Sequence, residues 1–159
     1  MLTITILCVG KIKEPFFKDA IGEYRKRLSR YCKLEIKEVP DEKIPDKINT
    51  SLAENIKQKE CLLLKQQLPK DSYVFCLDLS GKEYSSEEFS TKLTSLSIET
   101  SHITFLIGGS LGISSDLLQL ANQKICFSKM TFPHQLIRVF LLEQIFRAFK
   151  IAQGETYHR

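Results

Sequence analysis

The sequence predicts an α/β protein with a mostly parallel, five-stranded sheet flanked by helices. Apolar, β-branched segments alternate with segments of helical spacing five times along the 159 residues. This alternation is typical of parallel sheets, in which each helix crosses over between two strands. Neither internal repeats nor linkers interrupt the chain, so we expect a single domain spanning 1–159. The proportions of hydrophobic residues (43%) and charged residues (26%) are those of a globular protein.

The first half of the chain contains two predicted strands and two predicted helices. The stretch 2–10 is apolar and β-branched and closes on a glycine, which predicts a buried strand. A proline opens the helix expected over 15–28, where apolar residues recur at helical spacing. Polar and apolar residues alternate over 33–39, which favours a strand near the sheet edge. After a polar, proline-bearing loop, a helix is expected over 52–68, and Pro69 directly after it ends the helix.

A third strand is expected over 73–79, because this run is apolar and rich in aromatic and β-branched residues. Ser85 and Glu88 then have the spacing of a capping box, in which each side chain bonds the other residue's backbone N–H. A helix through Leu96 is therefore predicted after Ser85.

The last third contains two more predicted strands, each followed by a helix. Strands are expected over 102–109 and 124–130. The short helix between them has Ser114 or Ser115 as its N-cap. The final helix follows Pro133, a residue that suits the first turn of a helix.

The final helix is apolar on nearly every side. Glu143, Arg147 and Lys150 form one narrow stripe, and His134 and Arg138 lie opposite it among apolar residues. Since one face of a sheet cannot cover both flanks of such a helix, we expect a second copy of the chain to cover one of them. This predicts a homodimer with His134 and Arg138 near the subunit boundary.

Composition favours a cytoplasmic protein without a membrane segment or metal. The five cysteines are odd in number and lack CxxC spacing, which indicates buried thiols in a reducing compartment. The first residues resemble a strand more than a signal peptide, and no apolar run is long enough to span a membrane. The net charge of +4 is concentrated in 1–37 and 127–159. Basic ends are compatible with a polyanionic partner, although solvated helix faces explain most such runs.

Ligand-binding residues are expected in the loops that follow strands, because parallel sheets bind ligands beyond the carboxyl ends of their strands. The glycine loop over 107–112 lets backbone approach a ligand, although a tight turn explains its glycines equally well. It does not match the GxGxxG or Walker A patterns, which argues against NAD and ATP.

Polar residues converge at the end of the fifth predicted strand. Ser128, Lys129, Thr131 and His134 have the composition of a ligand-pocket wall. A capping or core role for His134 and a solvated position for Lys129 are equally good interpretations.

The chain ends in Tyr157, His158 and Arg159, which are residue types that stack on bases and contact phosphate. A frayed terminus is the alternative. We expect this tail to serve an RNA substrate and to contribute little to the fold.

Several motifs resemble those of the bacterial ribosomal large-subunit methyltransferase H family, in the SPOUT class. They are VGKIKE, IGGS.G, and the block from FSKMTFPHQ to GETYHR, and the resemblance covers the whole chain. It implies a homodimer with a C-terminal trefoil knot. It also implies methyl transfer from S-adenosylmethionine to N3 of a pseudouridine in helix 69 of 23S ribosomal RNA, within the assembled 70S ribosome.

The resemblance also implies the site residues. The cofactor contacts fall on Leu77, Gly108, Phe127, Ser128, Lys129, Met130, Thr131 and Phe132. The target side falls on His134, Tyr157, His158 and Arg159, with the base among them left open. The alternatives are a ribose 2′-O-methyltransferase and a catalytically silent RNA-binding protein on the same fold.

Overall fold

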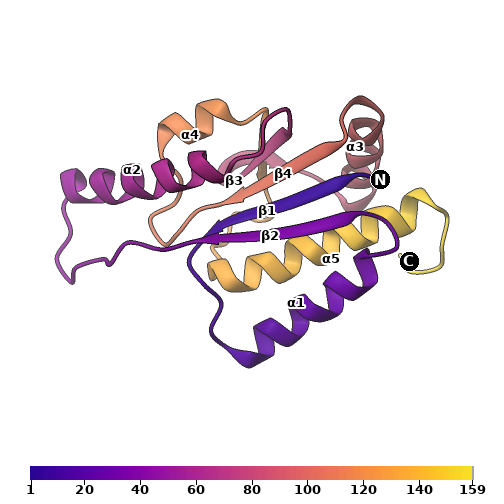
Figure 1. Cartoon of the computed structure of the whole chain (residues 1–159), viewed down its shortest axis with the longest axis horizontal. Helices are drawn as coiled ribbons and strands as arrows, with labels where there is room; N and C mark the ends of the chain where they lie inside the picture. The colour runs from indigo at the N-terminus through magenta and orange to yellow at the C-terminus, as the bar shows by residue number, and fades with distance from the viewer. Residues whose placement is uncertain (159) are drawn as a thin grey trace.

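Figure 1 shows the computed structural model of the chain, which describes residues 1–158. The strands are β1 (Thr3–Val9), β2 (Lys33–Val39), β3 (Tyr73–Glu83), β4 (His102–Ile107) and β5 (Gln123–Cys126). The helices are α1 (Pro15–Leu28), α2 (Thr50–Gln67), α3 (Ser86–Glu99), α4 (Ser115–Leu120) and α5 (His134–Ala152). The strands pair in the order β2-β1-β4-β3-β5, and every pairing is parallel. The predicted α/β class and the edge position of β2 are confirmed.

Helices cover both faces of the sheet, as Figure 1 shows. α1, α3 and α5 pack on one face, where the larger apolar cluster includes Phe75, Phe105 and Ile145. α2 and α4 pack on the other face around a smaller cluster that includes Leu64 and Leu106. Burial on both faces explains why the central strands are apolar throughout and do not alternate.

Two predicted caps form as expected. Ser85 accepts a hydrogen bond from the Glu88 N–H at 3.1 Å, and the Glu88 carboxylate accepts from the Ser85 N–H at 2.8 Å. Ser114, and not Ser115, caps α4 by accepting from the Leu117 N–H at 3.4 Å.

The sequence predicted the wrong C-terminal ends for β3 and β5. β3 continues beyond the predicted 73–79, because after an irregularity Lys82 and Glu83 pair with the end of β5. β5 ends at Cys126, and the remainder of the predicted 124–130 is a loop. There the Met130 N–H donates to Ser128 Oγ at 3.0 Å, which turns the chain away from the sheet.

Helix α5 lies between α1 and α3 (Figure 1). On one flank Tyr24 of α1 donates a hydrogen bond to Glu143 at 2.6 Å. On the other flank Ser90 of α3 donates to the Ala148 carbonyl at 2.7 Å. α1 and α3 of the same chain therefore cover the two flanks of α5. The expectation of a second subunit assumed that one flank is uncovered, and this assumption was wrong. Phe140, in the first half of the helix, is 38% exposed, and the homodimer stays a prediction.

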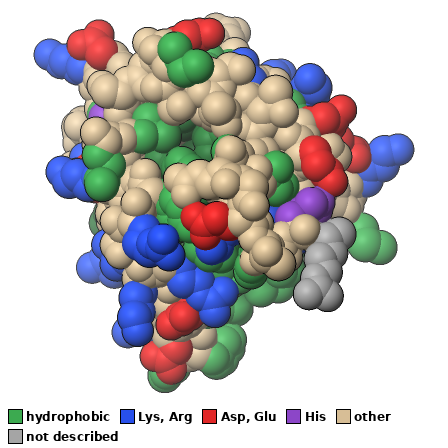
Figure 2. All heavy atoms as spheres, turned by 90° about the vertical axis from the view of Figure 1, so that its right-hand side faces the viewer, with side chains coloured by type: hydrophobic (Ala, Val, Ile, Leu, Met, Phe, Trp, Pro, Cys, Tyr) green, Lys and Arg blue, Asp and Glu red, His purple; other side chains and the backbone are tan. Residues whose placement is uncertain are grey.

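The surface shows no segregation of charge on the face seen in Figure 2, where acidic side chains lie among the lysines and arginines. Among residues 1–158, no helix combines the length and apolarity that a membrane crossing requires. Within the same range no group of three His, Cys, Asp or Glu side chains is placed to hold a metal ion. All five cysteines are buried as free thiols.

Candidate functional site

A pocket lies at the carboxyl edge of the sheet, where β3, β4 and β5 end. Its lining includes every residue expected to contact the cofactor except Lys129, whose side chain is exposed. The pocket therefore brings together Leu77, Gly108, Phe127, Ser128, Met130, Thr131 and Phe132. The loops after β3, β4 and β5 come from distant parts of the chain, and they meet because parallel strands end at one edge of the sheet.

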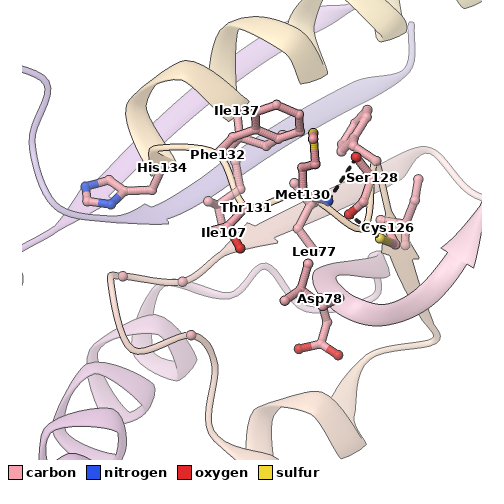
Figure 3. Close-up of a pocket in the computed structure, with 16 residues that line it drawn as sticks. Leu77, Asp78, Ile107, Cys126, Ser128, Met130, Thr131, Phe132, His134 and Ile137 are labelled. Carbon is pink, nitrogen blue, oxygen red and sulfur yellow. Dashed lines mark hydrogen bonds between the residues drawn. The ribbon is translucent and has the colours of Figure 1, made fainter.

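The pocket is mostly apolar. Leu77, Ile107 and Ile137 form its walls, and Asp78 lies at one side, where its carboxylate accepts hydrogen bonds from Ser80. In Figure 3 the Met130 side chain extends from the loop across this space. The accessible space is about 160 Å³. Ligand pockets usually measure roughly 300–1,000 Å³, so a whole cofactor fits only if part of it stays in solvent or the loop moves outward.

The glycine loop owes its composition to its own tight turn. A Cβ on Gly108 would lie 2.6 Å from the Ile113 side chain and 2.8 Å from the Gly112 carbonyl. The Gly112 N–H donates to the Gly109 carbonyl at 3.0 Å, which closes the turn. Gly112 also has a φ of +84°, a conformation that side-chain-bearing residues rarely adopt. These contacts favour the tight-turn interpretation, because the missing side chain at Gly108 makes room for the loop itself.

Arg138 joins the start of α5 to the ends of β1 and β2. Its guanidinium pairs with Glu38 at 2.7 Å and donates to the carbonyls of Val9 and Gly10 at 2.9 and 2.8 Å. The side chain is 1% exposed, so these charge-assisted bonds are needed to compensate for the lost water. The partners lie in β2 and at the end of β1 of the same chain, and the expectation that Arg138 lies near a subunit boundary stays a prediction.

His134 begins α5, one turn before Arg138. Burial, and secondarily the positive charge of Arg138, lower the pKa of His134 below its ordinary value. The imidazole is therefore neutral at pH 7 and can either donate or accept a hydrogen bond. A Cβ on Gly10 would lie 3.4 Å from His134 Nε2, an ordinary contact distance, so the ring lies directly beside the Gly10 backbone.

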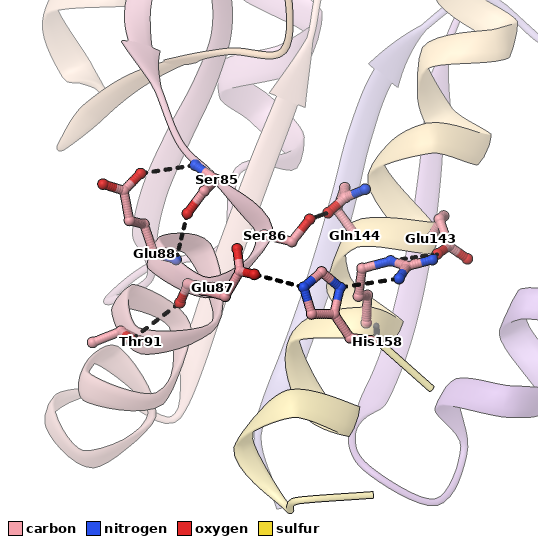
Figure 4. Close-up of polar contacts among 9 residues, drawn as sticks. Ser85, Ser86, Glu87, Glu88, Thr91, Glu143, Gln144 and His158 are labelled. Atoms are coloured by element: carbon pink, nitrogen blue, oxygen red, sulfur yellow. Dashed lines mark hydrogen bonds and ion pairs between the residues drawn. The ribbon is translucent and has the colours of Figure 1, made fainter. Parts of the chain in front are cut away.

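The tail is docked on the protein and is not frayed. Tyr157 donates to the Glu143 carboxylate at 2.9 Å, and its ring lies edge-on to Phe146 with 4.9 Å between centroids. The His158 ring bonds the Glu87 carboxylate at 2.6 Å, as Figure 4 shows. Its other nitrogen lies 3.1 Å from the guanidinium of Arg147. The expectation that the tail contributes little to the fold is therefore wrong. Arg159 lies outside the described residues.

The tail folds back along α5 after the helix ends. Tyr157 contacts Glu143, which follows His134 on the helix by about 14 Å at a rise of about 1.5 Å per residue. His134 lines the pocket, whereas the side chains of Tyr157 and His158 bond Glu143, Arg147 and Glu87. The residues expected on the target side are thus not brought together within one chain.

Sequence reasoning missed several residues near the site. Asp78 and Ile137 line the pocket, and Asp78 could have been found as the acid that directly follows an apolar strand residue. The Lys11 and Lys13 side chains line a second cavity that also reaches His134. No local signal marks that cavity, because it forms between the ends of two strands and α5.

Comparison with known proteins gives a consistent result over the whole chain. The family model described as Predicted SPOUT methyltransferase matches residues 2–158. The Ribosomal RNA large subunit methyltransferase H of Clostridium acetobutylicum is 52% identical over 159 residues, covering 99% of this chain and 100% of that protein. The protein of the same name from Clostridium kluyveri is 53% identical over the same shares of both chains. Ribosomal RNA large subunit methyltransferase H 1 of Clostridium perfringens is 51% identical, also over 99% of this chain.

Proposed function

This chain belongs to the SPOUT methyltransferase family, and we propose that it methylates N3 of a pseudouridine in helix 69 of 23S ribosomal RNA. The methyl donor is S-adenosylmethionine, and the substrate is the assembled 70S ribosome in the cytoplasm. The observation that carries the proposal is the single pocket formed by nearly all the expected cofactor residues. The names of the full-length relatives, which are large-subunit rRNA methyltransferases, support it.

The pocket fits such a cofactor in its chemistry. Leu77, Ile107 and Ile137 offer apolar surface to an adenine ring, and the Asp78 carboxylate can accept hydrogen bonds from hydroxyl or ammonium groups. Backbone groups of the Phe127–Phe132 loop complete the wall. When bound, S-adenosylmethionine supplies an electrophilic methyl group on sulfur.

The chain's own residues then have to position the acceptor and handle its proton. The N3–H of pseudouridine is an imide, which must lose its proton before or during attack on the methyl group. A neutral His134 next to the pocket can accept a hydrogen bond or a proton there. Holding two reactants in line is itself a large part of such catalysis.

The positions of the tail and the pocket along α5 support a homodimer in which the tail acts on the other subunit. Tyr157 contacts Glu143 and Phe146, which lie after Phe140 on the helix, whereas the pocket residues Ile137 and His134 lie at matching separations before it. Antiparallel contact of two α5 helices through Phe140 would bring each tail to the partner's pocket. We also propose that this chain has the C-terminal trefoil knot of the family.

Mixed dimers test the action of the tail in trans. One subunit carries Gly108→Ala, and the other lacks residues 157–159. About half of wild-type activity is expected, because one of the two composite sites keeps both an intact pocket and an intact tail. Activity no higher than that of either parent homodimer would contradict action in trans.

The experiment that tests the function uses 70S ribosomes from a strain lacking this enzyme. They are incubated with the purified protein and radiolabelled S-adenosylmethionine, and the labelled nucleotide is mapped by mass spectrometry. We expect N3-methylpseudouridine in helix 69 and little labelling of free 23S rRNA. Label on a ribose 2′-oxygen would favour the alternative enzyme class. Cofactor binding without transfer to either substrate would contradict an enzymatic role.

A further inference from the structure

A second cavity lies beside the cofactor pocket on the same edge of the sheet. It occupies about 540 Å³ where β1 and β2 end, and its walls include Gly10, Lys11, Lys13 and Asp41. This volume lies within the roughly 300–1,000 Å³ typical of small-molecule sites. The cavity is therefore large enough for a nucleotide.

His134 lines both cavities. In Figure 3 its ring points away from Met130 and Phe132, the side chains that border the cofactor pocket. The ring therefore lies toward Gly10, at the side of the second cavity. A methyl acceptor must be adjacent to the donor, and this cavity adjoins the pocket through one residue.

The lining of the second cavity suits a polar ring attached to phosphate. Lys11 and Lys13 are exposed and can contact phosphate oxygens, whereas Gln135 offers an amide to a base edge. Glu14 and Asp41 add carboxylates to the lining, and a carboxylate can accept a hydrogen bond from a base N–H or a ribose hydroxyl.

The geometry around His134 is held by the fold. The bonds from Arg138 to the Val9 and Gly10 carbonyls tie the first turns of α5 to β1, beside the cavity. Gly10 has a φ of +89°, a conformation that side-chain-bearing residues rarely adopt, and its backbone lies beside the His134 ring. The wall shared by the two cavities is thus anchored before any substrate binds.

We propose that the second cavity receives the target nucleotide, with its pyrimidine ring beside His134 and its flanking phosphates on Lys11 and Lys13. This inference rests on the proposed function and adds the place where the RNA enters. Lys129 and Lys70 lie outside this cavity.

The first test measures ribosome binding as a function of salt for wild type, Lys11→Ala, Lys13→Ala and the double variant. Each phosphate contact adds roughly 0.7–0.9 to the slope of log affinity against log salt. We therefore expect each single variant to lower that slope by about that amount and to weaken binding about threefold to tenfold. Binding of S-adenosylmethionine, measured by calorimetry, should stay unchanged.

The matched control is Lys70→Ala. Lys70 is equally exposed but precedes β3, at the opposite edge of the sheet. It should bind ribosomes with the wild-type affinity and salt slope. If Lys11→Ala and Lys13→Ala also keep the wild-type slope, the proposal is overturned. Because this assay follows binding, it decides the matter even if wild-type protein fails to methylate ribosomes, a result that would contradict the proposed function alone.

The second test locates the ring. The chain has 3 histidines, so their imidazole signals can be assigned by NMR from single substitutions. Pseudouridine 5′-monophosphate at millimolar concentration should shift the His134 signals and leave His102 unchanged, since His102 contacts Thr5 at the other edge of the sheet. A change in salt slope without a shift at His134 would assign the lysines to more distant phosphates and overturn the placement of the base.

Discussion

Gly108→Ala adds one methyl group at the most crowded point of the glycine loop. On the existing backbone its Cβ would lie 2.6 Å from Ile113 Cγ1 and 2.8 Å from the carbonyl carbon and oxygen of Gly112. Ile113 can change rotamer, but the Gly112 carbonyl belongs to the backbone of the turn. The turn closed by the bond between Gly112 and Gly109 must therefore open or shift.

The size of the effect follows from the nature of this clash. Inserting a methyl group into a well-packed site costs about 1–3 kcal/mol when neighbours must move. If the loop relieves the clash by leaving the pocket wall, S-adenosylmethionine must restore it on binding. Since 1.4 kcal/mol is a factor of ten in affinity, the dissociation constant should rise about 5-fold to 150-fold. Gly108→Val should raise the dissociation constant by at least as much.

Calorimetry with S-adenosylmethionine measures this loss, and urea denaturation shows whether the variant is folded. The control is Gly22→Ala in α1, where nothing lies within 4 Å of the new Cβ. It should bind the cofactor as wild type does and gain roughly 0.5–1 kcal/mol of stability. A folded Gly108→Ala protein with wild-type affinity would show that the glycine loop does not hold the cofactor.

Three further predictions concern α5 and the tail. Arg138→Met should lower the free energy of unfolding in urea by about 3–5 kcal/mol, because a buried charge pair loses one partner. Glu38→Gln should lower it less, since the Glu38 side chain is 30% exposed. Equal losses of stability in the two variants would contradict the assigned burial of Arg138. Phe140→Glu should convert a dimer into monomers in sedimentation, and an unchanged dimer would exclude this face of α5 as the interface. Tyr157→Phe removes only the hydrogen bond to Glu143, so it should cost about 1 kcal/mol of stability. It should also slow methylation of ribosomes without changing cofactor affinity, whereas a wild-type rate would leave the tail a purely structural role.

The sequence determined the elements that depend on near neighbours. A helix begins at Pro15 because the proline lacks only an N–H that no helix start uses. Ser85 and Glu88 form their capping box within four residues of chain, so their spacing alone predicts it. The cofactor loops could also be anticipated, because parallel strands joined by helices must end at one edge of the sheet.

Only the tertiary structure decided where the last strands end and what α5 contacts. β5 ends at Cys126 because strand pairing depends on a partner far along the chain, and no local pattern records how far that partner reaches. Arg138 is buried because Glu38 and the end of β1 meet it across 100 residues or more of sequence. The Tyr157 ring is held in the same way, by the side chains of Glu143 and Phe146. The helical spacing of α5 shows which residues share a side, but the neighbours on that side are chosen by the packing of α1 and α3.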